Sequence, residues 1–147
     1  MNKLNNITNF IKVDDRISTA GQPTKKQFKK IKKEGFNIVI NLATCDLKRG
    51  AIKQEDKIIS DLGMSYFHIP ITWEKPEVDR MKLFLILLET LDKKNNKIFI
   101  HCIMNYRVSV FIYKYKQYIL KQKGVKLIAP KLFKPSKKWA KIIKMKL

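Results

Sequence analysis

Short apolar runs alternate along the chain with longer segments in which apolar residues recur every three or four positions. The runs predict four strands, and the periodic segments predict helices. Strands that alternate with helices are typical of an α/β fold, with a mostly parallel central sheet of four to five strands flanked by helices. The predicted strands span residues 16–20, 36–42, 65–71 and 98–100.

Local signals mark where the helices begin and end. Thr24 and Gln27 form a capping-box pattern at the start of the first helix, and Gly35 follows its last residue. Pro76 suits the first turn of a helix that follows the third strand. Residues 108–120 are apolar nearly all round, which predicts a helix buried against the sheet. A last helix is predicted within residues 136–147.

Chemically capable side chains follow the carboxyl ends of three predicted strands. Cys45 and Asp46 follow the second strand, Glu74 follows the third and Cys102 follows the fourth. Ligands of parallel sheets bind beyond these strand ends. We therefore expect the three loops to meet at one cleft. His68 lies within the third strand and is interpreted as a core or edge residue rather than a ligand.

The stretch from Lys97 to Ser109 carries the strongest chemical signal. A buried strand ends at His101 and Cys102, and Arg107 follows at the start of a predicted helix. Loop and first-turn N–H groups of such a strand–loop–helix unit form an anion site, in which a cysteine is expected to be a nucleophilic thiolate. A cysteine at a strand end can also be mere packing. Arg107 favours the functional interpretation, because residues 93–147 contain no acidic partner for it.

The charge is strongly positive and unevenly distributed. The formal net charge is +20, and residues 93–147 contribute fifteen lysines and one arginine without any acid. Such a basic half can attract an anionic partner, which leaves a phosphorylated protein, a nucleic acid and an acidic lipid surface open. A solvated lysine surface is the alternative.

Composition argues against several classes of protein. Two cysteines and two histidines do not predict a disulfide framework or a metal site, and no cofactor motif is present. The N-terminus lacks the apolar run of a signal peptide, and no stretch is long and apolar enough to predict a membrane span. We expect one domain over residues 1–147, located in the cytoplasm.

Several segments resemble a known family, in the same order along nearly the whole chain. They are STAGQPT (18–24), INL (40–42), Glu55, LGMSYFHIPITW (62–73), IHCIMNYRVS (100–109) and Trp139. In these segments the sequence is similar to the small bacterial dual-specificity-like cysteine phosphatases, a branch of the protein tyrosine phosphatase superfamily. The resemblance implies a sheet–helix phosphatase domain that works through a cysteinyl-phosphate intermediate.

The phosphate loop is a short variant of the family pattern. Four residues separate Cys102 from Arg107, where the superfamily usually has five with a central glycine. Val108 stands between Arg107 and Ser109, where the family commonly places a hydroxyl residue directly after the arginine. Asn105 is a residue that can adopt the left-handed conformation otherwise supplied by glycine.

The resemblance implies roles for these residues. Cys102 would be the nucleophile, and Arg107 would bind the phosphate. The general acid is less well defined: Glu74 is the leading candidate, with Asp46 and Asp79 as alternatives. The remaining phosphate-loop residues are His101, supporting the thiolate, Ile103, Met104, Asn105 and Tyr106, which donate backbone N–H groups, and Ser109, which either donates to the sulfur or only packs in the helix.

Two other functions and one regulatory feature stay open. A loop of this length also fits rhodanese-like sulfurtransferases, and the absence of a clear acid fits a catalytically weak phosphate-binding pseudophosphatase. Cys45 matches a cysteine of the phosphatases of regenerating liver that can form a disulfide with the nucleophile. This match makes Cys45 a possible redox partner of Cys102, with a small buried thiol as the alternative.

Overall fold

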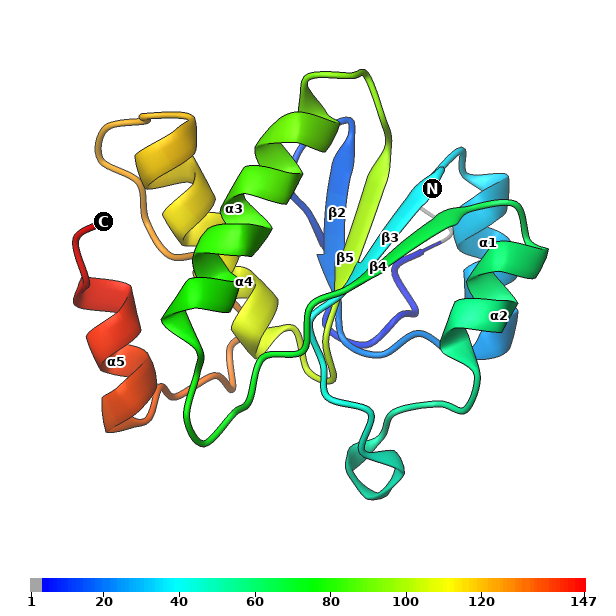
Figure 1. Ribbon diagram of the computed structural model, residues 1–147, viewed down its shortest axis with the longest axis horizontal. Coiled ribbons are helices and arrows are strands. Elements are labelled where there is room, and N and C mark those ends of the chain that lie inside the picture. Colours follow the sequence, from blue (N-terminus) through cyan, green and yellow to red (C-terminus); the bar gives the residue numbers. More distant parts are fainter. Residues whose placement is uncertain (1–3) are drawn as a thin grey trace.

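The computed structural model describes residues 4–147, which form a five-stranded sheet between two groups of helices (Figure 1). The sheet order is β1-β2-β5-β3-β4, and all pairs except β1 with β2 are parallel. The mostly parallel α/β fold expected from the sequence is therefore confirmed. The strands are β1 (Ile11–Lys12), β2 (Ile17–Ala20), β3 (Ile38–Asn41), β4 (Ser65–His68) and β5 (Ile98–His101).

The central strand β5 is covered on both faces because its side chains alternate between two apolar cores. Phe99 packs with α1 (Lys25–Lys33) and α2 (Glu55–Asp61). Ile98 and Ile100 pack with α3 (Val78–Asp92), α4 (Tyr106–Lys114) and α5 (Lys137–Lys144). Burying both faces removes most of the apolar surface of the strand from water.

Several elements differ in extent from the sequence expectations, and one strand was not predicted. The short strand β1 pairs antiparallel with β2 and was not predicted, since two residues carry no detectable alternation. Strand β4 ends at His68, before Pro70, which cannot donate to a strand ladder. The predicted helix 108–120 begins at Tyr106 and continues from Lys114 into the π-helical turn η2 (Tyr115–Ile119).

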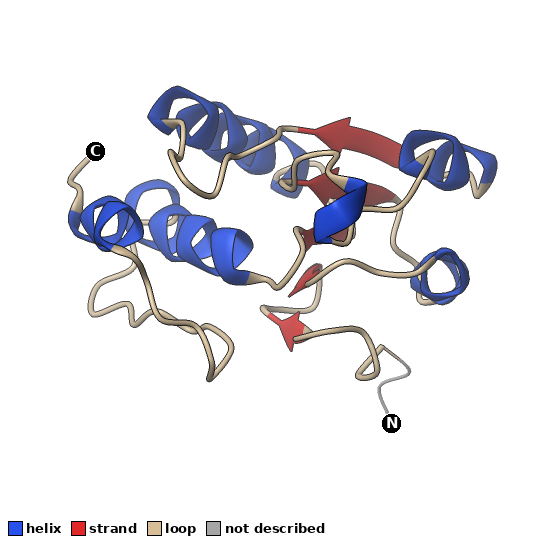
Figure 2. Ribbon diagram, turned by 90° about the horizontal axis from the view of Figure 1, so that it is seen from below, coloured by secondary structure: helices blue, strands red, loops and turns tan. Residues whose placement is uncertain are grey.

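The parallel strands all point toward one end of the molecule, which Figure 2 shows from below. The loop after β5, the 3-10 turn η1 (Leu47–Arg49) after β3 and the connection between β4 and α3 all lie at this end. The three loops expected to form one cleft therefore lie at the same end of the sheet, beyond the carboxyl ends of its parallel strands. Within residues 4–147 no helix is long and apolar enough to cross a membrane.

Candidate active site

Cys102 follows β5 directly and is completely buried at the start of the loop that leads into α4. The carbonyl oxygens of this loop are held from outside it. Gln22 N donates to Ile103 O at 3.0 Å, and Asn9 Nδ2 donates to Met104 O at 2.9 Å. Gly21 permits this packing, because a Cβ at that position would collide with the Ile103 carbonyl oxygen. The loop conformation is therefore set by the two residues that follow β2 and by the N-terminal segment.

The N–H groups of residues 103–107 are left available for a ligand. Among the hydrogen bonds of residues 4–147, none uses these five N–H groups as donors. They precede or begin α4, whose dipole adds positive potential at its N-terminus. These five N–H groups follow Cys102 and reach into the first turn of α4, the position from which a strand–loop–helix unit binds an anion.

Asn105 provides the sharp turn before α4. Its φ of 66° is the left-handed conformation that the sequence analysis anticipated for this residue. Its side-chain nitrogen donates to Asn9 O at 2.9 Å and to Thr19 Oγ1 at 3.0 Å. Ser109 Oγ donates to Asn105 O at 2.6 Å. The Ser109 hydroxyl thus supports the loop backbone in this structure, whereas the sequence left open donation to the Cys102 sulfur and simple packing in the helix.

Arg107 is buried and only partly satisfied. Its Nη1 donates to Ile71 O at 2.8 Å, which ties α4 to the connection after β4. Its Nε is buried and has no hydrogen-bond partner among residues 4–147. A buried donor without a partner costs about 1–3 kcal/mol, so this Nε is a group that a bound anion would stabilise by accepting its hydrogen bond.

His101 connects the loop to a buried carboxylate. Its Nδ1 lies 3.0 Å from Cys102 O, and its Nε2 lies 2.7 Å from Glu55 Oε2. Gln22 Nε2 donates to the other Glu55 oxygen at 2.7 Å. Burial alone raises the pKa of Glu55, but the charge of His101 and hydrogen bonds from His101, Gln22 and Tyr66 outweigh it and lower the pKa. The pair fixes the ring of His101 against the loop. Sequence reasoning placed Glu55 only among the family motifs and missed this contact.

Replacing Glu55 by glutamine is expected to destabilise the fold. Because its pKa in the folded chain is below that of an unfolded glutamate, about 4.3, Glu55 stabilises the fold at neutral pH, and this contribution is lost as the pH falls through the folded pKa. Urea unfolding at pH 7 should show a loss of about 2–4 kcal/mol in Glu55→Gln. The difference from wild type should shrink below about pH 4.

The matched control is Glu89→Gln, which removes an exposed ion pair with Lys93 on α3. Its free energy of unfolding should change by less than about 1 kcal/mol at either pH. Equal losses in the two variants would contradict the role given to the buried pair.

Two of the three candidate acids, Glu74 and Asp46, form ion pairs with the same arginine. Arg49 Nη1 lies 2.5 Å from Glu74 Oε1, and Arg49 Nε lies 3.5 Å from Asp46 Oδ2. The hydrogen bond from Arg49 lowers the pKa of Glu74, and the charge of Arg107 acts in the same direction. Asp46 also caps η1 by accepting from Lys48 N. Asp79 lies in the first turn of α3, outside this ion-pair cluster.

An aromatic cluster supports the loop from the C-terminal side. Tyr106 stacks on Phe133 with ring centroids 4.9 Å apart, and Trp73 stacks on Trp139 at 5.2 Å. Trp139 Nε1 also donates to Trp73 O at 2.8 Å. Helix α5 and the segment before it thereby fix both Tyr106 and the connection that carries Glu74.

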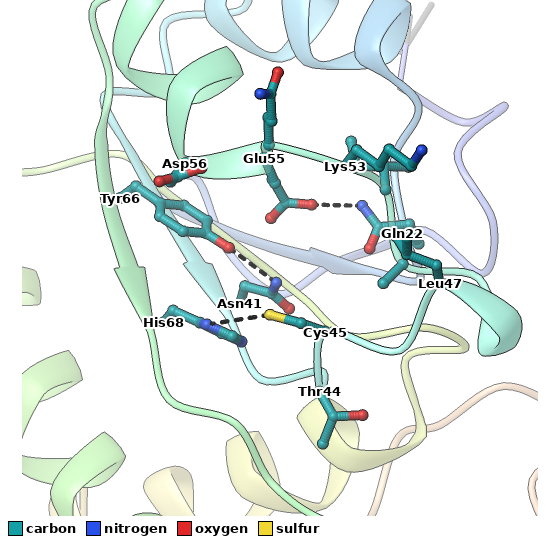
Figure 3. A pocket seen from close by; sticks show the side chains of 13 residues that line it. Gln22, Asn41, Thr44, Cys45, Leu47, Lys53, Glu55, Asp56, Tyr66 and His68 are labelled. Carbon is teal, nitrogen blue, oxygen red and sulfur yellow. Dashed lines mark hydrogen bonds between the residues drawn. The ribbon is translucent and has the colours of Figure 1, made fainter.

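The two cysteines, Cys45 and Cys102, lie in different surroundings. Both thiols are free, Cys45 is exposed, and its sulfur is 4.0 Å from His68 Nδ1 (Figure 3). The expected packing role of His68 is therefore incomplete, since its ring also faces a thiol. A disulfide between Cys45 and Cys102 stays a prediction.

No group of three or more His, Cys, Asp or Glu side chains within residues 4–147 is arranged to hold a metal ion.

No protein-family model and no curated protein matches the chain. Among solved structures, it is similar to a protein from Shewanella putrefaciens CN-32 that is named as a DUF442 phosphatase. The two are 27% identical, the match covers 95% of this chain and 91% of that chain, and the TM-score is 0.85.

More distant structures share the fold. The core catalytic domain of a PP-IP phosphatase from S. cerevisiae is 16% identical, with 76% of this chain and 66% of that chain covered and a TM-score of 0.60. TpbA of P. aeruginosa, solved with pTyr, is 12% identical, with 78% and 66% covered and a TM-score of 0.59. The fold that the sequence motifs indicated is shared with these solved structures and is therefore confirmed.

Proposed function

We propose that the chain is a cysteine-dependent phosphatase that hydrolyses phosphomonoesters. The observation that carries this proposal is the loop after Cys102, whose five N–H groups have no partner within residues 4–147 and which leads to Arg107, whose buried Nε has none either. A phosphoryl group fits this arrangement, since its equatorial oxygens can accept from the loop and from the guanidinium together. The likeness to a protein named as a phosphatase, at 27% identity, supports the same chemistry.

The mechanism follows from these positions. Cys102 Sγ attacks phosphorus, the bond from phosphorus to the ester oxygen breaks, and the leaving oxygen takes a proton from a general acid. Arg107 and the loop N–H groups bind the three equatorial oxygens as charge shifts during transfer. Water then attacks the cysteinyl-phosphate, which releases inorganic phosphate and restores the thiolate. His101 positions the loop through its contact with Cys102 O.

The general acid is proposed to be Glu74, released from Arg49 when substrate binds. Removing the arginine in Arg49→Gln is expected to raise the pKa of Glu74, because the Arg49 hydrogen bond is the main cause of its lowering. A higher pKa keeps the acid protonated to higher pH, so the falling limb of the kcat/KM profile should move upward in pH. An unchanged limb would reject Glu74 and leave Asp46 and Asp79 as the candidates.

The substrate is proposed to carry more negative charge than one phosphotyrosine. Phe133 stacks on Tyr106 at the start of α4, and the exposed Lys131 and Lys134 lie on either side of Phe133 along the chain. Both lysines belong to residues 93–147, a stretch without an acidic residue. A phosphorylated protein rich in acidic groups suits this charge pattern, and a nucleic acid or an acidic lipid would be attracted by the same field.

The test of the proposed function is release of inorganic phosphate from a small aryl phosphate by the wild-type protein between pH 5 and 8. Transfer of sulfur from thiosulfate to cyanide is measured in parallel. Phosphate release without thiocyanate formation supports the phosphatase. Thiocyanate formation alone identifies a rhodanese-like sulfurtransferase, and phosphate binding without either turnover identifies a pseudophosphatase.

A further inference from the structure

A pocket that has no part in the proposed mechanism lies on the side of Glu55 and Gln22, two residues that contact the phosphate loop. Its volume is about 830 Å³, and neither Cys102 nor Arg107 lines it. It opens between the loop after β3, the start of α2 and strand β4 (Figure 3). Polar side chains dominate the part nearest the sheet, namely Gln22, Asn41, Glu55, Tyr66 and His68.

The pocket holds a thiol with a positioned base. His68 Nε2 lies 2.6 Å from Ala43 O, and a carbonyl oxygen only accepts, so Nε2 carries the ring hydrogen. In the neutral ring Nδ1 is then the nitrogen that can accept, and it lies 4.0 Å from the Cys45 sulfur. The Cys45 thiol, the His68 ring and the Ala43 carbonyl thus follow one another in space as nucleophile, base and orienting group, as in activated thiols. Cys45 is exposed, so a reagent in the pocket can reach it.

The other walls of the pocket suit a small peptide-like thiol compound. Lys53 supplies a cation for a carboxylate, and the side chains of Thr44 and Gln54 offer donors and acceptors for amides. The volume is within the range that holds a ligand of several hundred daltons, about 300–1,000 Å³. Cys102, in contrast to Cys45, is completely buried and does not line this pocket.

We propose that Cys45 is a modification site that forms a mixed disulfide with a low-molecular-weight thiol. His68 takes the Cys45 proton, and the thiolate attacks one sulfur of a small disulfide. The new bond joins Cys45 Sγ to that sulfur, the bond between the two reagent sulfurs breaks, and the departing thiolate takes up a proton. The small disulfide is the oxidant, so no further reagent is required.

The modification acts on the phosphate loop through Glu55. Glu55 lines the pocket, accepts from Gln22 and holds His101, which in turn contacts Cys102 O. Asn41 and Tyr66, joined by a 3.0 Å hydrogen bond, line the same wall. A group attached to Cys45 occupies the space next to these side chains. It displaces Glu55 and thereby changes the contact that holds the ring of His101. This consequence for turnover rests on the proposed phosphatase function.

The test exposes the full-length protein to oxidised glutathione as the probe and locates the adduct by intact mass and peptide mapping. We expect one adduct on Cys45, removed by a reducing agent and equally present in Cys102→Ser. In His68→Gln the rate of adduct formation at neutral pH should fall about tenfold, because the base is lost while a donor to Ala43 O remains. An adduct on Cys102 alone, an internal Cys45–Cys102 disulfide or an unchanged rate in His68→Gln would overturn the proposal.

Activity is a separate readout of the same samples. The glutathionylated wild type should hydrolyse the aryl phosphate several-fold more slowly than the reduced protein, and reduction should restore the rate. Cys45→Ser, treated identically, should show no change. Mass mapping decides the modification even if the unmodified protein does not release phosphate, so the two proposals fail independently. Equal rates in an active, fully modified sample would overturn the link to the loop.

Discussion

Cys102→Ser is expected to lower the rate of aryl phosphate hydrolysis by at least about 10³-fold, the largest effect of any single substitution. A serine hydroxyl at neutral pH is a far weaker nucleophile than a thiolate, and no base within residues 4–147 is hydrogen-bonded to the side chain at this position. The change is nearly isosteric at a completely buried site, so the fold should be retained. In acid-quenched samples, covalent phosphate should be present on the wild type and absent from the variant.

Cys45→Ser is the matched control, because it makes the same chemical change at the other free thiol. Hydrolysis by this variant should remain close to that of the wild type. Activity that survives in Cys102→Ser would show that another group attacks phosphorus. Activity lost in both variants would show that turnover also needs the Cys45 side chain, which has no part in the proposed mechanism.

The fold could be predicted because its local and global signals agree. The capping box of Thr24 and Gln27 is present as expected, with Gln27 N donating to Thr24 Oγ1 at 3.1 Å. Buried parallel strands also read as continuous apolar runs, which is why β3 and β5 were identified. Strand β1 was missed because its two residues are held by pairing with β2 rather than by their own pattern.

The supporting contacts of the candidate site depend on distance in space rather than on sequence. Glu55 is 46 residues from His101, and no periodicity links a helix start to the end of a strand. The partner of the Ser109 hydroxyl depends on the turn at Asn105, so its donation to Asn105 O was not foreseen. Arg49 is a similar case, since only the folded chain brings it to Glu74 and changes what that carboxylate can do.

The loop variant links these observations to chemistry. A shorter loop has fewer N–H groups, and its conformation must be held firmly if the remaining donors are to converge on one anion. Asn105 supplies the left-handed turn, while Gln22 and Asn9 hold the carbonyl groups away from the site. The neighbours of the loop therefore contribute the preorganisation that additional loop residues would otherwise provide.

Arg107→Lys is expected to lower kcat/KM by about 10²–10³-fold, with most of the loss in kcat. Lysine keeps the charge but lacks the planar fork that binds two phosphate oxygens, and a donor equivalent to Nε is missing. The Ile71 carbonyl loses its partner as well. Steady-state kinetics with the aryl phosphate, together with inhibition by inorganic phosphate, measure both consequences.

Arg80→Lys separates the phosphate role of Arg107 from its structural contact. Arg80 Nη1 donates to Pro70 O at 2.7 Å, one residue before the carbonyl that Arg107 holds, but Arg80 lies on the exposed side of α3. Its replacement should leave kcat/KM within about twofold, as for most surface substitutions. Similar losses in the two variants would mean that Arg107 acts by holding the connection after β4. A loss confined to Arg107→Lys, with thermal unfolding unchanged, assigns the buried Nε to the phosphoryl group.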